Sequence, residues 1–208
     1  MSRAVDYFFS LISPYAYLGH AEFLRIAHAA GATVHYKPVP LGKLFPESGG
    51  LPLAKRHPMR RAYRMIELQR WREKRNVPLV LQPKHWPFDP QLADRLTIAV
   101  AQQHPDAIDA FAALAFRGVW VEEQDLADEA CLRDILKSAG IEDDSLIDAA
   151  RSEETAKTYD SNLADALEVG AFGSPCYVID REVFWGQDRL DMVADMLATE
   201  RAAYSAEV

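Results

Sequence analysis

Cysteine is scarce in this chain of 208 residues. Only Cys131 and Cys176 are present, 45 positions apart. The sequence has no CxxC pair and no zinc-type spacing of cysteines and histidines, which argues against both a structural metal and a disulfide framework. We therefore expect no metal site.

Long hydrophobic runs are also missing, although 49% of the residues are hydrophobic. No stretch approaches the roughly 20 uncharged apolar residues that a membrane span needs. The opening residues, Met-Ser-Arg-Ala-Val-Asp-Tyr-Phe-Phe, lack the apolar run and cleavage site of a signal peptide. We therefore expect a cytoplasmic protein with no membrane partner, built as one large domain or as a domain with an insertion.

Positive charge is in the minority, with 23 basic against 31 acidic residues and a net charge of −8. This balance argues against nucleic acid as a partner. The charge is unevenly spread, because residues 55–75 hold nine basic and two acidic side chains. That segment carries +7, which leaves −15 for the rest of the chain.

The two ends of the chain show β and α patterns. Alternating apolar residues predict a strand over 5–9, Ser13-Pro14 is typical of a helix start, and 33–36 predicts a second strand. Strand, helix and strand form a βαβ unit with a right-handed crossover. Near the other end, 176–179 and 183–185 predict a hairpin, and Asp188 is expected to cap a last helix.

The middle of the chain is helical. Residues 82–90 predict a loop because they hold three prolines. Removing the helices leaves βαβ followed by ββα, which is the thioredoxin order. We therefore predict an α/β, thioredoxin-like fold with a large all-helical insertion: a discontinuous domain of residues 1–45 and 165–208, and an inserted helical domain of 46–164. The predicted helices of the insertion cover 58–76, 91–103, 107–119, 126–138, 143–151 and 153–168.

The first candidate site is the start of the first helix. In redox members of this fold the turn holds CxxC, but here the two positions are Ser13 and Ala16, and neither supplies a thiolate. A helix N-terminus still offers free N–H groups and partial positive charge. A Ser13 hydroxyl there can donate to a ligand's thiolate and lower its pKa. The alternative is that Ser13 is an ordinary N-cap.

Two further segments converge on that turn in thioredoxin-like folds. The proline of Gly173-Ser174-Pro175 is cis in such folds, and the backbone of Ser174 can then pair with an extended peptide. Gly186-Gln187-Asp188 offers N–H groups for a carboxylate and Asp188 for an ammonium group. The alternatives, an ordinary trans proline and a plain capping Asp, are favoured when each segment is read alone.

The basic helix around Arg60 and Arg61 offers a site for a second carboxylate or an anionic substrate, although most of its charges are expected to be solvated. Taken together, the three segments describe a ligand with a thiol, a peptide backbone and an α-amino acid end. Glutathione fits this description.

Three segments resemble one family. Residues 8–18 (FFSLISPYAYL), 169–175 (VGAFGSP) and 184–190 (FWGQDRL) resemble 2-hydroxychromene-2-carboxylate isomerases and the related kappa-class glutathione transferases. Residues 116–126 resemble the middle of the same family, so the match runs in order along nearly the whole chain.

The resemblance implies a homodimer with glutathione as cofactor and a small aromatic carboxylate as substrate. Ser13 would be catalytic and would contact the glutathione sulfur. Ser174 and Pro175 would hold the cysteinyl backbone, Gln187 and Asp188 the γ-glutamyl end, and Arg60 the glycine carboxylate.

Some positions depart from the family pattern. Gly50 stands where Asn is frequent, so one side-chain contact to glutathione is lost or supplied elsewhere. Gln187 stands where Ser or Asn is commoner, and Asp89 where Asn is frequent. Tyr15, Trp86 and Asp89 are expected near the substrate.

The implied reaction is glutathione-dependent isomerisation of 2-hydroxychromene-2-carboxylate or a similar aromatic enone acid, a step in bacterial naphthalene breakdown. Three alternatives stay open: a kappa-like glutathione transferase, a thiol–disulfide oxidoreductase, and a non-catalytic module that binds glutathione or a peptide. The Ser13/Ala16 pair argues against the oxidoreductase.

Overall fold

A computed structural model describes residues 3–199 and 201–205. Within them, four strands form one mixed sheet in the order β2-β1-β3-β4. β1 runs parallel to β2, whereas β3 is antiparallel to both β1 and β4. The strands are β1 (Ala4–Phe9), β2 (Thr33–Pro38), β3 (Cys176–Ile179) and β4 (Glu182–Trp185).

The helices complete the predicted order of elements. α1 (Pro14–Ala29) connects β1 to β2, and α9 (Leu190–Ala198) follows β4. The order βαβ, helices, ββα confirms the predicted thioredoxin-like fold with a large helical insertion. The intervening helices are α2 (Leu41–Glu47), α3 (Pro58–Arg75), α4 (Gln91–Gln103), α5 (Ile108–Trp120), α6 (Glu129–Ser138), α7 (Ser145–Arg151) and α8 (Glu153–Val169), with 3-10 turns η1 (Leu53–Lys55), η2 (Pro105–Ala107) and η3 (Gln187–Arg189).

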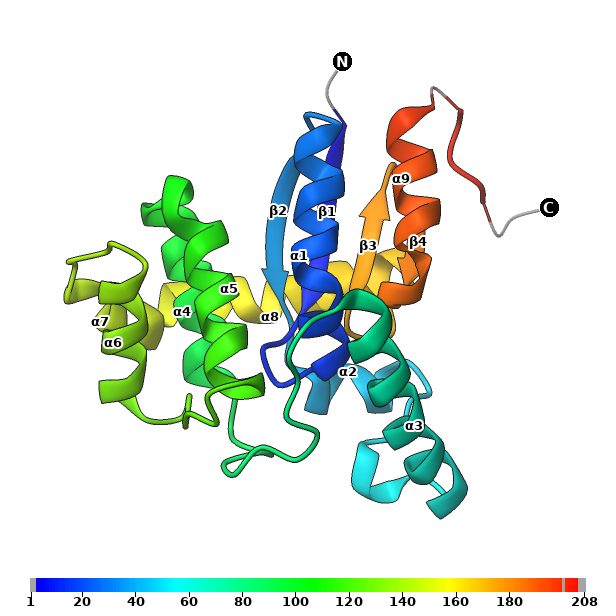
Figure 1. The fold of residues 1–208 in the computed structure, drawn as a ribbon. Helices are drawn as coiled ribbons and strands as arrows, with labels where there is room; N and C mark the ends of the chain where they lie inside the picture. Colours follow the sequence, from blue (N-terminus) through cyan, green and yellow to red (C-terminus); the bar gives the residue numbers. More distant parts are fainter. Residues whose placement is uncertain (1–2, 200, 206–208) are drawn as a thin grey trace.

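Both faces of the sheet are covered. Figure 1 shows α1 and α9 in front of the sheet and α8 passing behind it. Successive residues of a strand point to opposite faces. Tyr7 and Phe9 of β1 therefore join the large hydrophobic cluster on the α1 side, whereas Phe8 joins a smaller cluster that includes Ala166 of α8. Burial on both sides explains why the strand is apolar at consecutive positions.

The large cluster continues from the sheet into the helical part. The rings of Phe9 on β1 and Phe116 on α5 lie 5.7 Å apart between centroids, and both residues are fully or almost fully buried. The expected boundary at residue 165 falls inside α8. The division into two domains therefore stays a prediction.

Two local expectations differ from the structure. No element was predicted where α2 lies, and Pro46 stands inside this short helix. The prediction that Asp188 caps the last helix is wrong. Asp188 lies within η3 and its carboxylate pairs with Arg189, while α9 begins at Leu190 without a side-chain cap.

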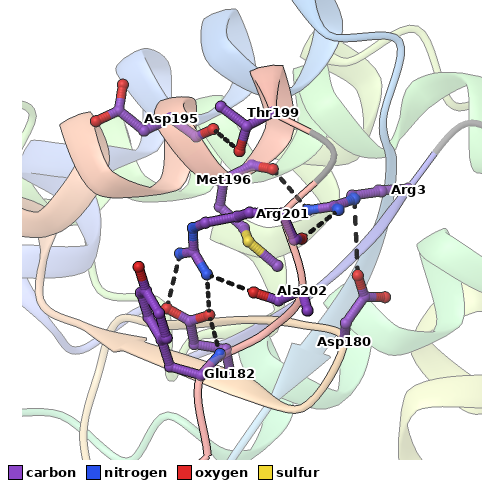
Figure 2. A network of polar contacts seen from close by, with 9 residues as sticks. Arg3, Asp180, Glu182, Asp195, Met196, Thr199, Arg201 and Ala202 are labelled. Carbon is purple, nitrogen blue, oxygen red and sulfur yellow. Dashed lines mark hydrogen bonds and ion pairs between the residues drawn. The ribbon is translucent and has the colours of Figure 1, made fainter.

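The C-terminal segment is held against the sheet by two arginines (Figure 2). Arg3 donates to the carbonyl oxygens of Met196 and Arg201 at 2.6 and 2.8 Å. Arg201 in turn pairs with Glu182 of β4 at 2.7 Å. These contacts join Arg3, which precedes β1, to the segment that follows α9, close to the start of β4. Among the described residues, no helix is both long and apolar enough to cross a membrane.

Candidate functional site

Ser13 is the N-cap of α1, as predicted. It has an extended backbone, and its Oγ accepts a hydrogen bond from Ala16 N at 3.2 Å. The same hydroxyl donates to the carbonyl oxygen of Ser174 at 3.0 Å. Ser13 therefore stabilises the start of the helix and joins it to a segment 161 residues away.

The Ser174–Pro175 segment lies against this turn. The Ser174–Pro175 peptide bond is cis, as the fold implies. The hydroxyl oxygen of Ser174 accepts from Ser10 N at 3.2 Å, and the carbonyl oxygen of Pro175 accepts from Gly186 N at 2.9 Å. Two of the segments singled out in the sequence thus contact each other directly, and the third is tied to them through Gly186.

The loop between β1 and α1, residues 10–13, is fixed by side chains of the helical part. Trp120 Nε1 donates to the carbonyl oxygen of Leu11, and Trp86 Nε1 to that of Ile12, each at 3.1 Å. Asp94 of α4 accepts from Leu11 N at 3.0 Å. The sequence analysis missed Asp94, although a carboxylate on the apolar face of a predicted helix is a usable signal.

Gln187 is buried, and the carbonyl groups of its side chain and backbone already have a partner. Arg75, the last residue of α3, donates to Gln187 Oε1 at 3.1 Å and to its backbone oxygen at 2.7 Å. η3 also packs closely on α1, where a Cβ added at Gly19 would lie 2.5 Å from Gln187 Cβ. Asp188 is exposed. Their role in binding glutathione stays a prediction.

Gly50 lies in the turn after α2. Its N–H donates to the carbonyl oxygen of Phe45 at 2.7 Å. A Cβ at this position would come within 3.1 Å of the Phe45 ring, so the ring restricts a larger residue here. Arg60 is exposed on the first turn of α3. The structure brings neither residue into contact with Ser13.

A groove of about 450 Å³ is lined in part by Trp86. Through its indole nitrogen, which donates to the carbonyl oxygen of Ile12, Trp86 connects the groove to the loop that precedes α1. The Arg64 guanidinium lies 5.3 Å from the centroid of the Trp86 ring. The groove is lined by Leu53, Pro58, Arg61, Ala62, Arg64, Met65, Leu81, Gln82 and Trp86.

The groove combines apolar walls with cations. Burial lowers the pKa of Arg64, whose guanidinium remains charged in the physiological range. Burial raises the pKa of Tyr15, and the positive charge of Arg64 opposes that shift. Tyr15 is therefore close enough to this lining residue of the groove to interact with its charge. Among the described residues, no carboxylate forms an ion pair with Arg61 or Arg64. The arrangement suits an anion with an aromatic body.

Asp89 does not line this groove. It lines a separate cavity of about 270 Å³ together with Arg95 and Arg151. Its Oδ1 accepts from Gln91 N at 3.1 Å, near the start of α4. Trp86 and Asp89, expected near one substrate, therefore line different cavities.

Neither cysteine offers a reactive thiolate. Burial raises the pKa of Cys176 to about 11, and burial with several neighbouring carboxylates raises that of Cys131 to about 11. Cys176 is fully buried on β3.

The comparison with known protein families decides the classification. A DSBA-like thioredoxin domain matches residues 4–198. The chain belongs to this family. Its first helix begins after Ser13, with Ala16 three positions on, and the sequence has no CxxC pair.

Individual relatives are similar along nearly their whole lengths. The 2-hydroxychromene-2-carboxylate isomerase of Sphingobium xenophagum is 27% identical over 198 residues, covering 95% of this chain and 99% of the relative. Glutathione S-transferase kappa 1 of Caenorhabditis elegans is 24% identical over 204 residues, covering 93% and 90%. A solved structure of a 2-hydroxychromene-2-carboxylate isomerase superposes with a TM-score of 0.79 at 24% identity, covering 94% of each chain.

Proposed function

We propose that this protein is a glutathione-dependent isomerase acting on 2-hydroxychromene-2-carboxylate or a similar aromatic enone acid. One observation carries the proposal. The Ser13 hydroxyl lies at the N-terminus of α1 in contact with Ser174, and Trp86, which donates to the carbonyl oxygen of the preceding residue Ile12, lines a groove together with Arg61 and Arg64. The isomerase and kappa transferase relatives support the same reading.

Glutathione would supply a reactive thiol at the Ser13 turn, where the chain has no cysteine. The Ser13 hydroxyl would turn from Ser174 O toward the sulfur, and the N–H groups of the first turn of α1 would favour the thiolate. Ser174 and Pro175 would lie along the cysteinyl backbone, Gln187 and Asp188 near the γ-glutamyl end, and Gly50 and Arg60 at the edge of the site. Arg61 and Arg64 would hold the substrate carboxylate, with Tyr15 and Trp86 against its ring.

Bound glutathione would supply a thiolate for reversible addition to the conjugated carbon of the ring-opened enone. Rotation about the former double bond and loss of the thiolate would then give the trans isomer, with glutathione regenerated and no redox change. Stabilisation of the thiolate by Ser13 assists both the addition and the departure.

The decisive experiment compares Ser13→Ala with Ser152→Ala. Ser152 caps α8 in the same way, since it accepts from Thr155 N at 3.2 Å and donates to Ala149 O at 2.7 Å. Each change removes one cap, worth about 1 kcal/mol. We expect Ser13→Ala to lower glutathione-dependent turnover about 100-fold and Ser152→Ala to leave it unchanged. Equal turnover in the two variants would remove Ser13 from the mechanism.

A kappa-like transferase is the second candidate, since a kappa transferase is similar over 93% of this chain. The two functions differ in their product, because a transferase releases a stable thioether and an isomerase regenerates glutathione. Mass spectrometry of the products separates them. Glutathione binding without turnover would favour the non-catalytic module, and activity in an insulin-reduction assay would favour the oxidoreductase.

The family resemblance also supports a homodimer in the cytoplasm. Light scattering after size exclusion should then give twice the chain mass of 23.4 kDa. A mass equal to one chain would exclude the dimer.

A further inference from the structure

Asp94 carries a fully buried carboxyl group inside the molecule. It lies on the inner face of α4, between apolar residues that pack in the large cluster. Among the described residues, no basic side chain forms an ion pair with it. A buried carboxylate without a cation is costly unless hydrogen-bond donors surround it.

Three donors reach this carboxyl, and two of them come from the loop that carries Ser13. Ser10 Oγ donates to Asp94 Oδ2 at 2.7 Å, and Leu11 N donates to Oδ1 at 3.0 Å. The third donor is the Tyr159 hydroxyl of α8, at 2.8 Å. Asp94 therefore joins α4, α8 and the 10–13 loop at a single point.

Ser10 extends this point of attachment to the candidate site. Its N–H donates to Ser174 Oγ at 3.2 Å, and its carbonyl oxygen accepts from Ser13 N at 3.0 Å. Ser174 in turn accepts the Ser13 hydroxyl at its carbonyl oxygen. A displacement of Ser10 therefore changes both partners of that contact.

We propose that Asp94 is a positioning residue, which holds the 10–13 loop so that the Ser13 hydroxyl meets Ser174 and, in the proposed reaction, the glutathione sulfur. The inference rests on the proposed function for its catalytic consequence. Its structural consequence, the position of the loop, stands on the contacts alone.

The protonation of Asp94 adds a measurable signature. Burial raises its pKa to about 7, while the hydrogen bonds from Leu11, Ser10 and Tyr159 oppose the shift and the charge of Asp89 adds to it. Arg95, the next residue, lies with its guanidinium 5.9 Å from the centroid of the Tyr159 ring. A protonated carboxyl loses acceptor capacity toward Ser10, Leu11 and Tyr159, so the loop senses the ionisation.

The experiment compares wild type, Asp94→Asn and Thr97→Val by NMR between pH 5 and 9. Asn keeps the shape but does not titrate, whereas Thr97 is a buried residue of the same helix whose hydroxyl donates to Ala93 O at 2.9 Å, away from the loop. In wild type and Thr97→Val we expect the amide shifts of Leu11, Ser13 and Ala16 to follow one midpoint near neutral pH. In Asp94→Asn that titration should vanish.

Kinetic measurements test the catalytic consequence of positioning by Asp94. We expect Asp94→Asn to lower kcat about tenfold with little change in KM for glutathione, while Thr97→Val, matched for thermal stability, keeps its kcat. Loop amides that titrate identically in wild type and Asp94→Asn would overturn the inference, as would an Asp94→Asn enzyme with full kcat. A wild type that shows the titration but no turnover would contradict the proposed function and leave the positioning of the loop supported.

Discussion

The Ser13 hydroxyl donates to the carbonyl oxygen of Ser174 at 3.0 Å, across 161 residues of sequence. One hydroxyl proton serves one acceptor at a time, so this contact must open when Ser13 donates to a ligand. The Ser13 oxygen can still accept from Ala16 N, 3.2 Å away, while its hydroxyl proton rotates toward the ligand. The cap of α1 and the proposed contact with sulfur are therefore compatible.

Arg64 should govern the binding of the substrate carboxylate. Arg64→Gln removes the cation that lies over Trp86, so we expect KM for a carboxylate substrate to rise about tenfold, because a charged hydrogen bond contributes roughly 1.5–3 kcal/mol. The matched control is Arg70→Gln on the same helix, where Arg70 is exposed and lies over Tyr63. An equal rise in KM for both variants would show that the effect comes from the loss of one positive charge on α3 and not from the position of Arg64.

Arg75 should control the affinity for glutathione through Gln187. Arg75→Gln removes two hydrogen bonds to Gln187, and we expect glutathione to bind about tenfold more weakly in calorimetry because the 186–188 segment loses its support. Lys74→Gln is the control, since Lys74 and Arg75 both lie over the Trp71 ring. Unchanged affinity in Arg75→Gln would show that Gln187 does not need this arginine.

Gly19 should not tolerate a side chain. A Cβ there would lie 2.5 Å from Gln187 Cβ and 2.9 Å from the Tyr177 hydroxyl. We expect Gly19→Ala to lower the free energy of unfolding by about 1–3 kcal/mol in urea titrations, the usual cost of overpacking. Gly42→Ala, with open space around its Cβ in α2, should be neutral or slightly stabilising. Equal free energies of unfolding for Gly19→Ala and Gly42→Ala would mean that η3 can move away from α1 without cost.

His20 should make the fold sensitive to acid. Burial lowers its pKa to about 4, with Asp109 opposing, whereas an unfolded chain binds the proton near pH 6.5. The unfolded state therefore takes up a proton first, and stability falls as the pH drops from about 6.5 to about 4. His20→Asn should lose less stability than wild type over that range in urea titrations.

The control for His20 is His57→Asn, at an exposed N-cap where Asn is equally suitable. We expect His57→Asn to leave the free energy of unfolding at neutral pH nearly unchanged, since Asn can also accept from Met59 N. Parallel curves for wild type and His20→Asn would assign the acid sensitivity to other groups.

Local sequence predicted most of the elements because their signals are local. The alternation over 5–9, the Ser13-Pro14 helix start and the two apolar runs near the C-terminus each depend on a few neighbouring residues. No element was predicted over α2, a short helix of seven residues that contains Pro46 and is held by tertiary packing of Leu44 in the smaller cluster. Asp188 was misjudged as a cap because the 3-10 turn η3, Gln187–Arg189, precedes α9, whose N-cap is Arg189.

The candidate site divides in the same way. The sequence by itself determined the chemical parts: a serine in place of a nucleophilic cysteine, the Ser174-Pro175 segment, and a basic helix in an acidic chain. Only the tertiary structure decided which parts meet. It placed Arg61 and Arg64, rather than Arg60, in the groove, assigned Asp89 to another cavity, and attached the Ser13 loop to Asp94. The physical reason is that burial, hydrogen-bond partners and shared cavities depend on contacts between residues far apart in the chain, which no local pattern encodes.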